Sequence, residues 1–555
     1  MKLRYHLLVP VALIIIIAAW IAVSWPRKVD MAEYAPADSI VYLECNSITS
    51  VADTITGSDA WQSWAANFGL PNVSHNRWLY LAASFGLAPA PSVILSRAQV
   101  AVVMLNLDAS EENTTLSIKP EGALIIETHT AAWRTRPVAE ATLQQFAERT
   151  YGAVSPKHSI EDAEYIEWDA PSGDRKIVAA IEGTLVVIGN SKRAVQRCLD
   201  AHRKPEASLR DEAGLRQMRA RIRMPQSLTF GYVSAGNAAR LVSWGAPLLF
   251  GREPGDATFE QIVTRNASRV LGAIGWTSRA EHREIEDRFV FNLEPSVISR
   301  LRPAFKVGQS TNSVWTVVPY NFATITVYRA QNPALAWDAL RGVTGQFDAV
   351  SAVLFSSVMK AALVSYGIEN PDKFLNAVGP EVATIKVNSQ GEGSVLIARV
   401  IDRPALEQIF KVPHSRKGEV SQAFDFELPD ADKKFSAAFA SDYLLVGARA
   451  DVSVCLDAER TGETIASQNK PKTLDPSLDS SASIVTYSND SERVQNFFSL
   501  LNSLRSGNRT TGVPALGLDP PFSTTETNLD DLGLDRRTRS PLGQFSTLVG
   551  LLKRD

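Results

Sequence analysis

The sequence predicts an α+β fold of two tandem copies of an antiparallel sheet with covering helices, preceded by one N-terminal transmembrane helix. Three observations lead to this prediction. A membrane-length apolar segment opens the chain, matched stretches recur in its two halves, and neighbouring β-rich runs are joined by turn residues, as in hairpins. Sequence therefore informs on architecture and location, whereas it does not identify a ligand.

The apolar segment runs from Leu7 to Trp25 without an ionisable side chain. At about 1.5 Å per helical residue it spans about 28 Å, close to the hydrocarbon thickness of a bilayer. Lys2 and Arg4 precede it, which favours a cytoplasmic N-terminus and a periplasmic body. A cleaved signal peptide is the main alternative, because Ala22-Val23-Ser24 resembles a poor cleavage site. We expect a retained signal-anchor within residues 1–28, which makes the lipid bilayer a partner.

The remainder of the chain is long enough for two to four domains and is acidic on balance. Residues 1–28 contain four Lys or Arg and no Asp or Glu, which leaves 53 bases against 60 acids and a net charge of −7. This balance argues against nucleic-acid binding. The three cysteines, Cys45, Cys198 and Cys455, are too few for a dense disulfide framework. The last two lie in helical patterns, where we expect them to be buried.

The internal duplication is clearest in one strand and the helix after it. Leu185–Gly189 is followed by a helical pattern that ends in Cys-Leu-Asp-Ala-His-Arg, and Leu444–Gly447 by one that ends in Cys-Leu-Asp-Ala-Glu-Arg. Upstream, Glu121–Ile126 matches Glu392–Ile397, and each is followed by an Arg-Pro pair that we expect to open a helix.

The expected elements follow the same order in both halves. In the first half we expect strands near 39–45, 98–105, 122–128, 163–168, 175–181 and 184–189, with helices near 59–68, 74–86, 137–150 and up to 203. In the second half we expect strands near 322–329, 381–388, 393–400, 423–428, 435–440 and 443–447, with helices near 333–342, 350–366, 403–411 and up to 460. Hairpin-like turns between strands imply antiparallel sheets, with helices on one face and partial exposure or a twin sheet on the other.

The sequence resembles a family of N-terminally anchored extracytoplasmic proteins with a large duplicated domain of unknown function. The resemblance rests on Pro36–Leu43, the strand at Leu185–Gly189 with its helix end at Cys198–Arg203, and the segment Ser208–Asp211. It covers most of residues 33–505 and brings no assigned activity.

These observations predict four regions. They are a tail and anchor at 1–28, a first repeat with extra strands at 33–314, a second repeat at 315–506, and a flexible linker with a short amphipathic end at 507–555. The extra strands, near 270–277 and 286–292, are assigned to the first sheet. The charged run from Asp535 to Arg539 is expected to be a solvated loop.

Catalytic and metal signatures are weak. Ser357 and Lys360 have the Ser-x-x-Lys spacing of penicillin-recognising enzymes, with Arg460-Thr461-Gly462 as a faint second element, but two fixed residues arise easily by chance. The scattered histidines form no paired metal motif, and Asp430-Ala431-Asp432 lacks the glycine and distal glutamate of a calcium loop. We therefore assign no catalytic, cofactor or metal residue.

The sequence thus favours a non-enzymatic binding or scaffolding module of the cell envelope, with an envelope protein or lipid as partner. Two alternatives remain. A lipid or hydrophobe carrier would need a large apolar cavity, and an envelope-polymer hydrolase would need a cleft around Ser357 and Lys360. The sequence leaves the oligomeric state open.

Overall fold

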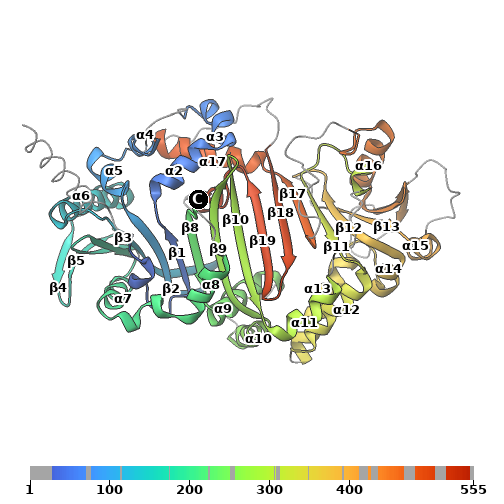
Figure 1. The fold of residues 1–555 in the computed structure, drawn as a ribbon, viewed down its shortest axis with the longest axis horizontal. Helices are drawn as coiled ribbons and strands as arrows, with labels where there is room; N and C mark the ends of the chain where they lie inside the picture. The colour runs from blue at the N-terminus through green and yellow to red at the C-terminus, as the bar shows by residue number, and fades with distance from the viewer. Residues whose placement is uncertain are drawn as a thin grey trace, which may run out of the picture. The chain divides into compact units, whose positions relative to one another are not determined.

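A computed structural model describes residues 28–70, 77–84, 86–112, 115–173, 175–222, 226–250, 257–305, 307, 313–347, 349–389, 393–411, 423–426, 435–467, 482–506 and 521–550. Helices and antiparallel strands occur along this whole range, which confirms the predicted α+β class (Figure 1). The expected membrane span, Leu7 to Trp25, lies outside the described residues. Within them, no helix is both long and apolar enough to cross a bilayer.

The chain divides into two compact units. Unit 1 comprises residues 1–52, 75–106 and 120–212, and unit 2 comprises residues 53–74, 107–119 and 213–555. This division differs from the expected boundary between residues 314 and 315. The reason is that residues 284–293, one of the extra strands, pair with residues 533–540.

Unit 1 is built around two antiparallel ladders. Its described strands are β1 (Val41–Cys45), β2 (Gln99–Glu112), β3 (Thr115–Glu127), β4 (Lys157–Ile160), β5 (Glu164–Asp169), β6 (Lys176–Glu182) and β7 (Leu185–Gly189), although the outer ends of β2 and β3 group with unit 2. β1 pairs with β2, and β3, β7, β6, β5 and β4 pair in that order. The helices are α4 (Arg77–Ser84), α5 (Pro89–Leu95), α6 (Ala132–Tyr151) and α7 (Lys192–Arg203), with 3-10 turns η2 (Met31–Tyr34), η4 (Pro205–Ala207) and η5 (Leu209–Asp211). α2 (Ile48–Gly57), which the sequence pattern missed, bridges the division at residue 52.

The first turn of α6 was not predicted. The Arg-Pro pattern placed a helix start at Pro137, whereas α6 begins at Ala132 and contains Pro137. A proline here removes one backbone hydrogen bond, to the carbonyl of Trp133, and the helix tolerates that loss. The second Arg-Pro pair behaves as expected, since α15 begins at Arg403 and Asp402 caps it.

Unit 2 contains the remaining described elements. Its strands are β8 (Thr229–Val233), β9 (Leu271–Glu281), β10 (Glu284–Leu293), β11 (Thr324–Arg329), β12 (Val378–Lys386), β13 (Val395–Val400), β14 (Ala423–Phe426), β15 (Phe435–Ala440), β16 (Tyr443–Ala448), β17 (Ile484–Asn489), β18 (Phe522–Leu529) and β19 (Gly533–Ser540). Its helices are α3 (Asp59–Trp64), α8 (Ala213–Ile222), α9 (Ala235–Phe250), α10 (Ala257–Ala267), α11 (Pro295–Ala304), α12 (Pro333–Thr344), α13 (Ala349–Val364), α14 (Pro371–Ala377), α15 (Arg403–Phe410), α16 (Arg449–Thr461), α17 (Ser491–Ser506) and α18 (Phe545–Gly550), with 3-10 turns η3 (Ala65–Phe68) and η6 (Ser313–Thr316).

One continuous antiparallel ladder runs through unit 2. The paired strands follow the order β14, β15, β16, β13, β12, β11, β17, β18, β19, β10, β9, β8. The extra strands β9 and β10 were predicted, but β10 pairs with β19 at the end of the chain. The central part of this ladder is visible in Figure 1 as a row of long strands.

The part of the sheet formed by strands β11 to β16 is covered by helices on both faces. The sequence pattern suggested covering helices on one face. Val395 and Ile397 of β13 share one core with Cys455 of α16. The alternate side chains, Leu396 and Ala398, belong to a second core with residues of α14 and α15. Burial on both faces explains why this strand is a continuous apolar run without alternation.

The two units repeat one set of strand pairings. β3–β7–β6–β5 in unit 1 corresponds to β13–β16–β15–β14 in unit 2. The register agrees as well: Gly189 faces Val178 where Gly447 faces Ser436, and Leu185 faces Glu182 where Tyr443 faces Ala440. The helix after each ladder buries its cysteine fully, so the predicted burial of Cys198 and Cys455 is confirmed.

The C-terminal region contradicts the prediction of a flexible linker and a solvated loop. Residues 507–520 lie outside the described range, but β18 and β19 form a hairpin that pairs with β17 on one side and β10 on the other. Arg288 binds Asp535 through three hydrogen bonds of 2.7 to 3.2 Å. The run Asp535–Arg539 was predicted to be a loop because its charge suggested solvent, whereas Asp535 and Arg539 have the cross-strand partners Arg288 and Glu286 and the run is part of a strand.

A glycine allows β19 to start this close to β10. Gly533 has φ of 141°, and a Cβ there would lie 2.1 Å from the carbonyl oxygen of Phe291. Any other residue would force the two strands apart.

We predict that Asp535→Ala destabilises unit 2 by roughly 3–5 kcal/mol, because it leaves the Arg288 guanidinium, 15% exposed, without its counter-charge. The double variant Arg288→Met/Asp535→Leu should recover most of this loss. Hydrogen exchange of the β10 and β19 amides in the full chain measures the effect.

The matched control is Asp338→Ala, which removes the exposed ion pair to Arg341 on α12 and should cost about 0–1 kcal/mol. Equal exchange rates in Asp535→Ala and Asp338→Ala would contradict a stabilising role for the Arg288–Asp535 pair.

Candidate functional site

A hollow of about 1170 Å³ opens in unit 2 at one end of the β11–β17 ladder. It lies between the segment before β11, the end of β12, the C-terminal half of α16, and the start of α17. Its lining residues are Pro319, Tyr320, Asn321, Phe322, Ala323, Val387, Asn388, Ser389, Val454, Asp457, Ala458, Glu463, Asn489, Ser491, Glu492 and Gln495.

Backbone hydrogen bonds hold the walls of the hollow together. The amide of Tyr320 donates to the carbonyl of Glu463 at 2.9 Å, which ties the segment before β11 to the loop after α16. The amide of Asn489 donates to the carbonyl of Ala323 at 2.8 Å. The Asn489 side-chain oxygen accepts from both the amide and the hydroxyl of Ser491, so it fixes the first turn of α17. These hydrogen bonds fix the positions of the lining residues at the ends of the strands.

The hollow has both apolar and polar surface, and its charged groups are acidic. Asp457, Glu463 and Glu492 contribute carboxylates, and the lining set contains no Lys, Arg or His. Arg460 donates to Asp457 at 2.7 Å and neutralises part of this charge. Amide and hydroxyl groups share the rest of the wall with proline, phenylalanine, valine and alanine side chains. Such a surface suits a ligand that carries positive charge and hydrogen-bond donors.

Ser357 and Lys360, the weak hydrolase candidates, lie on α13, and both side chains are exposed. The Ser357 hydroxyl donates to the carbonyl of Val353, one turn earlier in its own helix, at 2.8 Å. This is the ordinary hydrogen bond of a helical serine and does not indicate an activated nucleophile.

The other sequence candidates also have structural roles. Gly462 ends α16 in the left-handed region, with φ of 72°, so Arg460-Thr461-Gly462 is a helix terminus. Asp430 and Asp432 lie outside the described residues. Within the described ranges, no group of three or more His, Cys, Asp or Glu side chains is placed to hold a metal ion.

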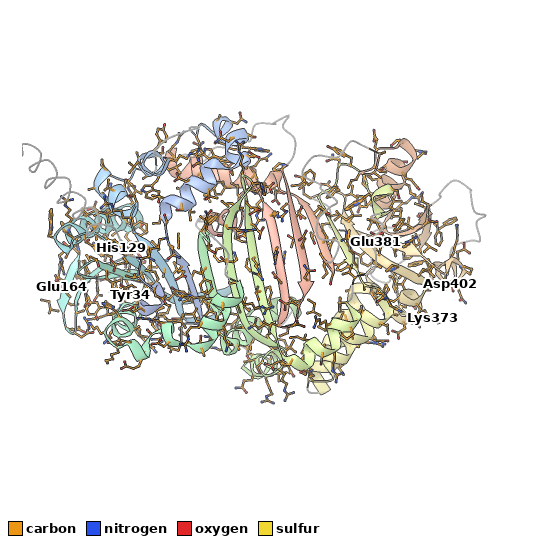
Figure 2. All side chains as sticks on the ribbon, viewed as in Figure 1. Tyr34, His129, Glu164, Lys373, Glu381 and Asp402 are labelled. Carbon is orange, nitrogen blue, oxygen red and sulfur yellow. The ribbon has the colours of Figure 1, made fainter. Side chains whose placement is uncertain are left out.

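A buried polar cluster in unit 1 was not found from sequence. Glu127, at the end of β3, accepts a hydrogen bond from the hydroxyl of Tyr34 at 3.2 Å and one from the amide of His129 at 3.1 Å. The imidazole Nε2 of His129 lies 2.9 Å from Oε1 of Gln99. Tyr34 and His129 are labelled in Figure 2. The cluster joins the first described turn of the chain to the sheet, and its partners lie too far apart in sequence to form a motif.

A second buried group, Asp287 of β10, holds the C-terminal segment. Its carboxylate accepts from the indole Nε1 of Trp276 at 3.1 Å and from the amide of Gln544 at 2.9 Å. The side chain is fully buried, and this burial raises the pKa of Asp287 to about 7. Gly543, with φ of 57°, permits the close approach, since a Cβ there would lie 2.8 Å from the carboxylate.

No protein-family model and no curated protein matches the sequence. Among solved structures, the chain is similar to crystal form I of TP0453, with 11% sequence identity and a TM-score of 0.24. The match covers 52% of this chain and 91% of that chain. A TM-score this low supports no statement about fold or function, and the family resemblance drawn from motifs stays a prediction.

We predict that the stability of unit 2 falls as pH rises from about 4 to about 7. The folded state keeps the proton on Asp287 up to about pH 7, whereas the unfolded chain releases it near the ordinary aspartate pKa of 3.8. The folded state therefore binds more protons in this window, and stability drops by about 1.4 kcal/mol per pH unit. Asp287→Asn should remove this slope.

Melting temperatures of the full chain measured between pH 6 and 7 isolate the effect. Burial also raises the pKa of Asp490, to about 6, so this second carboxyl contributes mainly below that window. A parent protein and an Asp287→Asn variant with the same pH slope between 6 and 7 would show that Asp287 does not titrate there.

Proposed function

We propose that the chain is a non-enzymatic binding module of the cell envelope, anchored in the membrane by Leu7–Trp25 with its body in the periplasm. The length of the apolar segment and the bases that precede it support the anchor. In this proposal the body consists of two tandem copies of one α+β repeat. The shared registers of β6–β7 and β15–β16 support that arrangement.

The acidic hollow in unit 2 is the observation that carries the binding function. It offers carboxylates and amides on a wall fixed by backbone hydrogen bonds. We propose that it binds a positively charged segment of an envelope protein. A cationic side chain would replace its hydration shell with carboxylate oxygens there, and the net negative charge of the body would favour the encounter.

The two alternatives have less support from the geometry. A hydrolase built on Ser357 and Lys360 would need a base that faces the serine, and the described contact of Ser357 is to its own helix. A hydrophobe carrier would need an apolar cavity without charged groups, and the carboxylates of Asp457, Glu463 and Glu492 line this hollow.

We predict that a photo-crosslinking amino acid at Gln495, in the hollow, captures a protein partner in native membranes. The same amino acid at Lys373, an exposed position of α14 labelled in Figure 2, should not capture it. Mass spectrometry of the cross-linked product identifies the partner.

The variant Glu463→Gln/Glu492→Gln tests the role of charge. Each neutralised carboxylate should weaken capture about fivefold, since an accessible ion pair contributes on the order of 1 kcal/mol. Capture that is equal from Gln495 and Lys373, or that is unchanged in the double variant, would exclude the hollow as the binding site.

A further inference from the structure

The first described residues of unit 1 are clamped to its sheet by one buried side chain. The Gln99 amide accepts from the amide of Val29 at 2.8 Å and donates to the carbonyl of Val29 at 3.0 Å. Gln99 is 1% exposed, at the start of β2. Asp30 then caps the η2 turn by accepting from the amide of Ala32. The chain therefore enters the folded body at Val29 in a fixed position.

This clamp limits how far unit 1 can lie from a membrane. Trp25 is the last residue of the apolar segment, and four residue steps separate it from Val29. Four steps of about 3.8 Å reach at most about 15 Å. If the segment spans the bilayer as proposed above, the surface of unit 1 around Val29 lies within the headgroup region or next to it.

An exposed tryptophan lies beside this entry point. His129 contacts the same Gln99 oxygen that accepts from Val29, at 2.9 Å, and α6 begins three residues later. Trp133, in the first turn of α6, is 70% exposed. The guanidinium of Arg134 lies 4.6 Å from the centre of its ring. An indole left in water is unfavourable, whereas the bilayer interface accommodates both its apolar ring and its N–H.

The charges around the entry point are mainly cationic. Lys28 precedes Val29, Arg97 precedes Gln99 by two residues, and Arg134 lies in the first turn of α6; all three are exposed. Three carboxylates near it have partners within the unit: Asp30 caps η2, Glu44 accepts from the hydroxyl of Tyr42, and Glu127 is buried against Tyr34 and His129. This local charge is opposite to the net charge of the body, and it complements an anionic lipid surface.

We propose that Lys28, Arg97, Trp133 and Arg134 form a membrane footing that binds anionic lipid headgroups and orients unit 1 at the bilayer. The Trp133 indole lies at headgroup level, and the three cations pair with lipid phosphates. This proposal rests on the anchor proposed above, and it adds a lipid-binding surface in a part of the chain separate from the acidic hollow.

The test places a bimane fluorophore at Ala132→Cys in the full chain, reconstituted in nanodiscs that contain anionic lipid with a headgroup nitroxide quencher. Cys45 is replaced by Ser, while Cys198 and Cys455 are fully buried, and burial raises the pKa of each thiol to about 12. The matched position is Ile160→Cys, 83% exposed on β4, which β7, β6 and β5 separate from β3. We expect loss of fluorescence at 132 and little loss at 160.

Substitutions in the footing identify its parts. Trp133→Ala and Arg97→Gln/Arg134→Gln should reduce the quenching by the nitroxide at 132, measured as the ratio of fluorescence with and without the nitroxide lipid because the indole itself quenches bimane. Lipid contact should weaken about fivefold for each charge removed. Phe146→Ala is the control, because Phe146 is also exposed on α6 but lies about 20 Å further along the helix. It should leave the quenching unchanged.

The outcomes separate this proposal from the anchor. A full chain that does not enter nanodiscs overturns the anchor, and the footing with it. A chain that enters them but shows equal quenching at 132 and 160, or quenching unaffected by the footing variants, overturns the footing alone.

Discussion

The pairing of β19 with β10 is the interaction on which the architecture of unit 2 depends. It connects the β8–β9–β10 strands to the β11–β17 ladder through the C-terminal hairpin. The pairing places Arg288 next to Asp535. Burying either charge without the other would be unfavourable, whereas the two together form an ion pair with hydrogen bonds. The hairpin also brings the amide of Gln544 to the carboxylate of Asp287. It therefore completes the sheet and supplies one hydrogen-bond donor to the buried Asp287.

Local patterns predicted the strands and helices of the two halves well, because burial on both faces leaves apolar runs that stand out from turns. They failed where a distant partner decided the conformation. Asp535–Arg539 resembles a solvated loop until β10 supplies opposite charges. The first turn of α6 was missed for another reason, since Pro137 was taken as a helix start although a helix tolerates it inside. The first turn of α6, which contains Trp133, was therefore not predicted, because the helix was expected to begin at Pro137.

The candidate sites were less predictable than the fold. The hollow gathers residues from 319 to 495, and each of its carboxylates looks like ordinary surface charge when read along the chain. The Gln99 clamp likewise uses an uncharged side chain 70 residues from its partner. No residue spacing encodes such contacts, because the sheet, and not a local motif, brings them together. The Ser357 and Lys360 spacing shows the converse, a recognisable pattern on a helix surface with only local contacts described.

The position of the last two strands also has a consequence for biosynthesis. Arg288 and its partner Asp535 are 247 residues apart, a length that takes roughly 12 to 50 s to translate at about 5–20 residues per second. Until the hairpin emerges, β10 and β17 would each present an unpaired backbone edge to any neighbouring chain. A nascent polypeptide that has not yet reached β18 and β19 thus has two unpaired strand edges open to aberrant pairing, and the sheet of unit 2 is complete only after this hairpin has been translated.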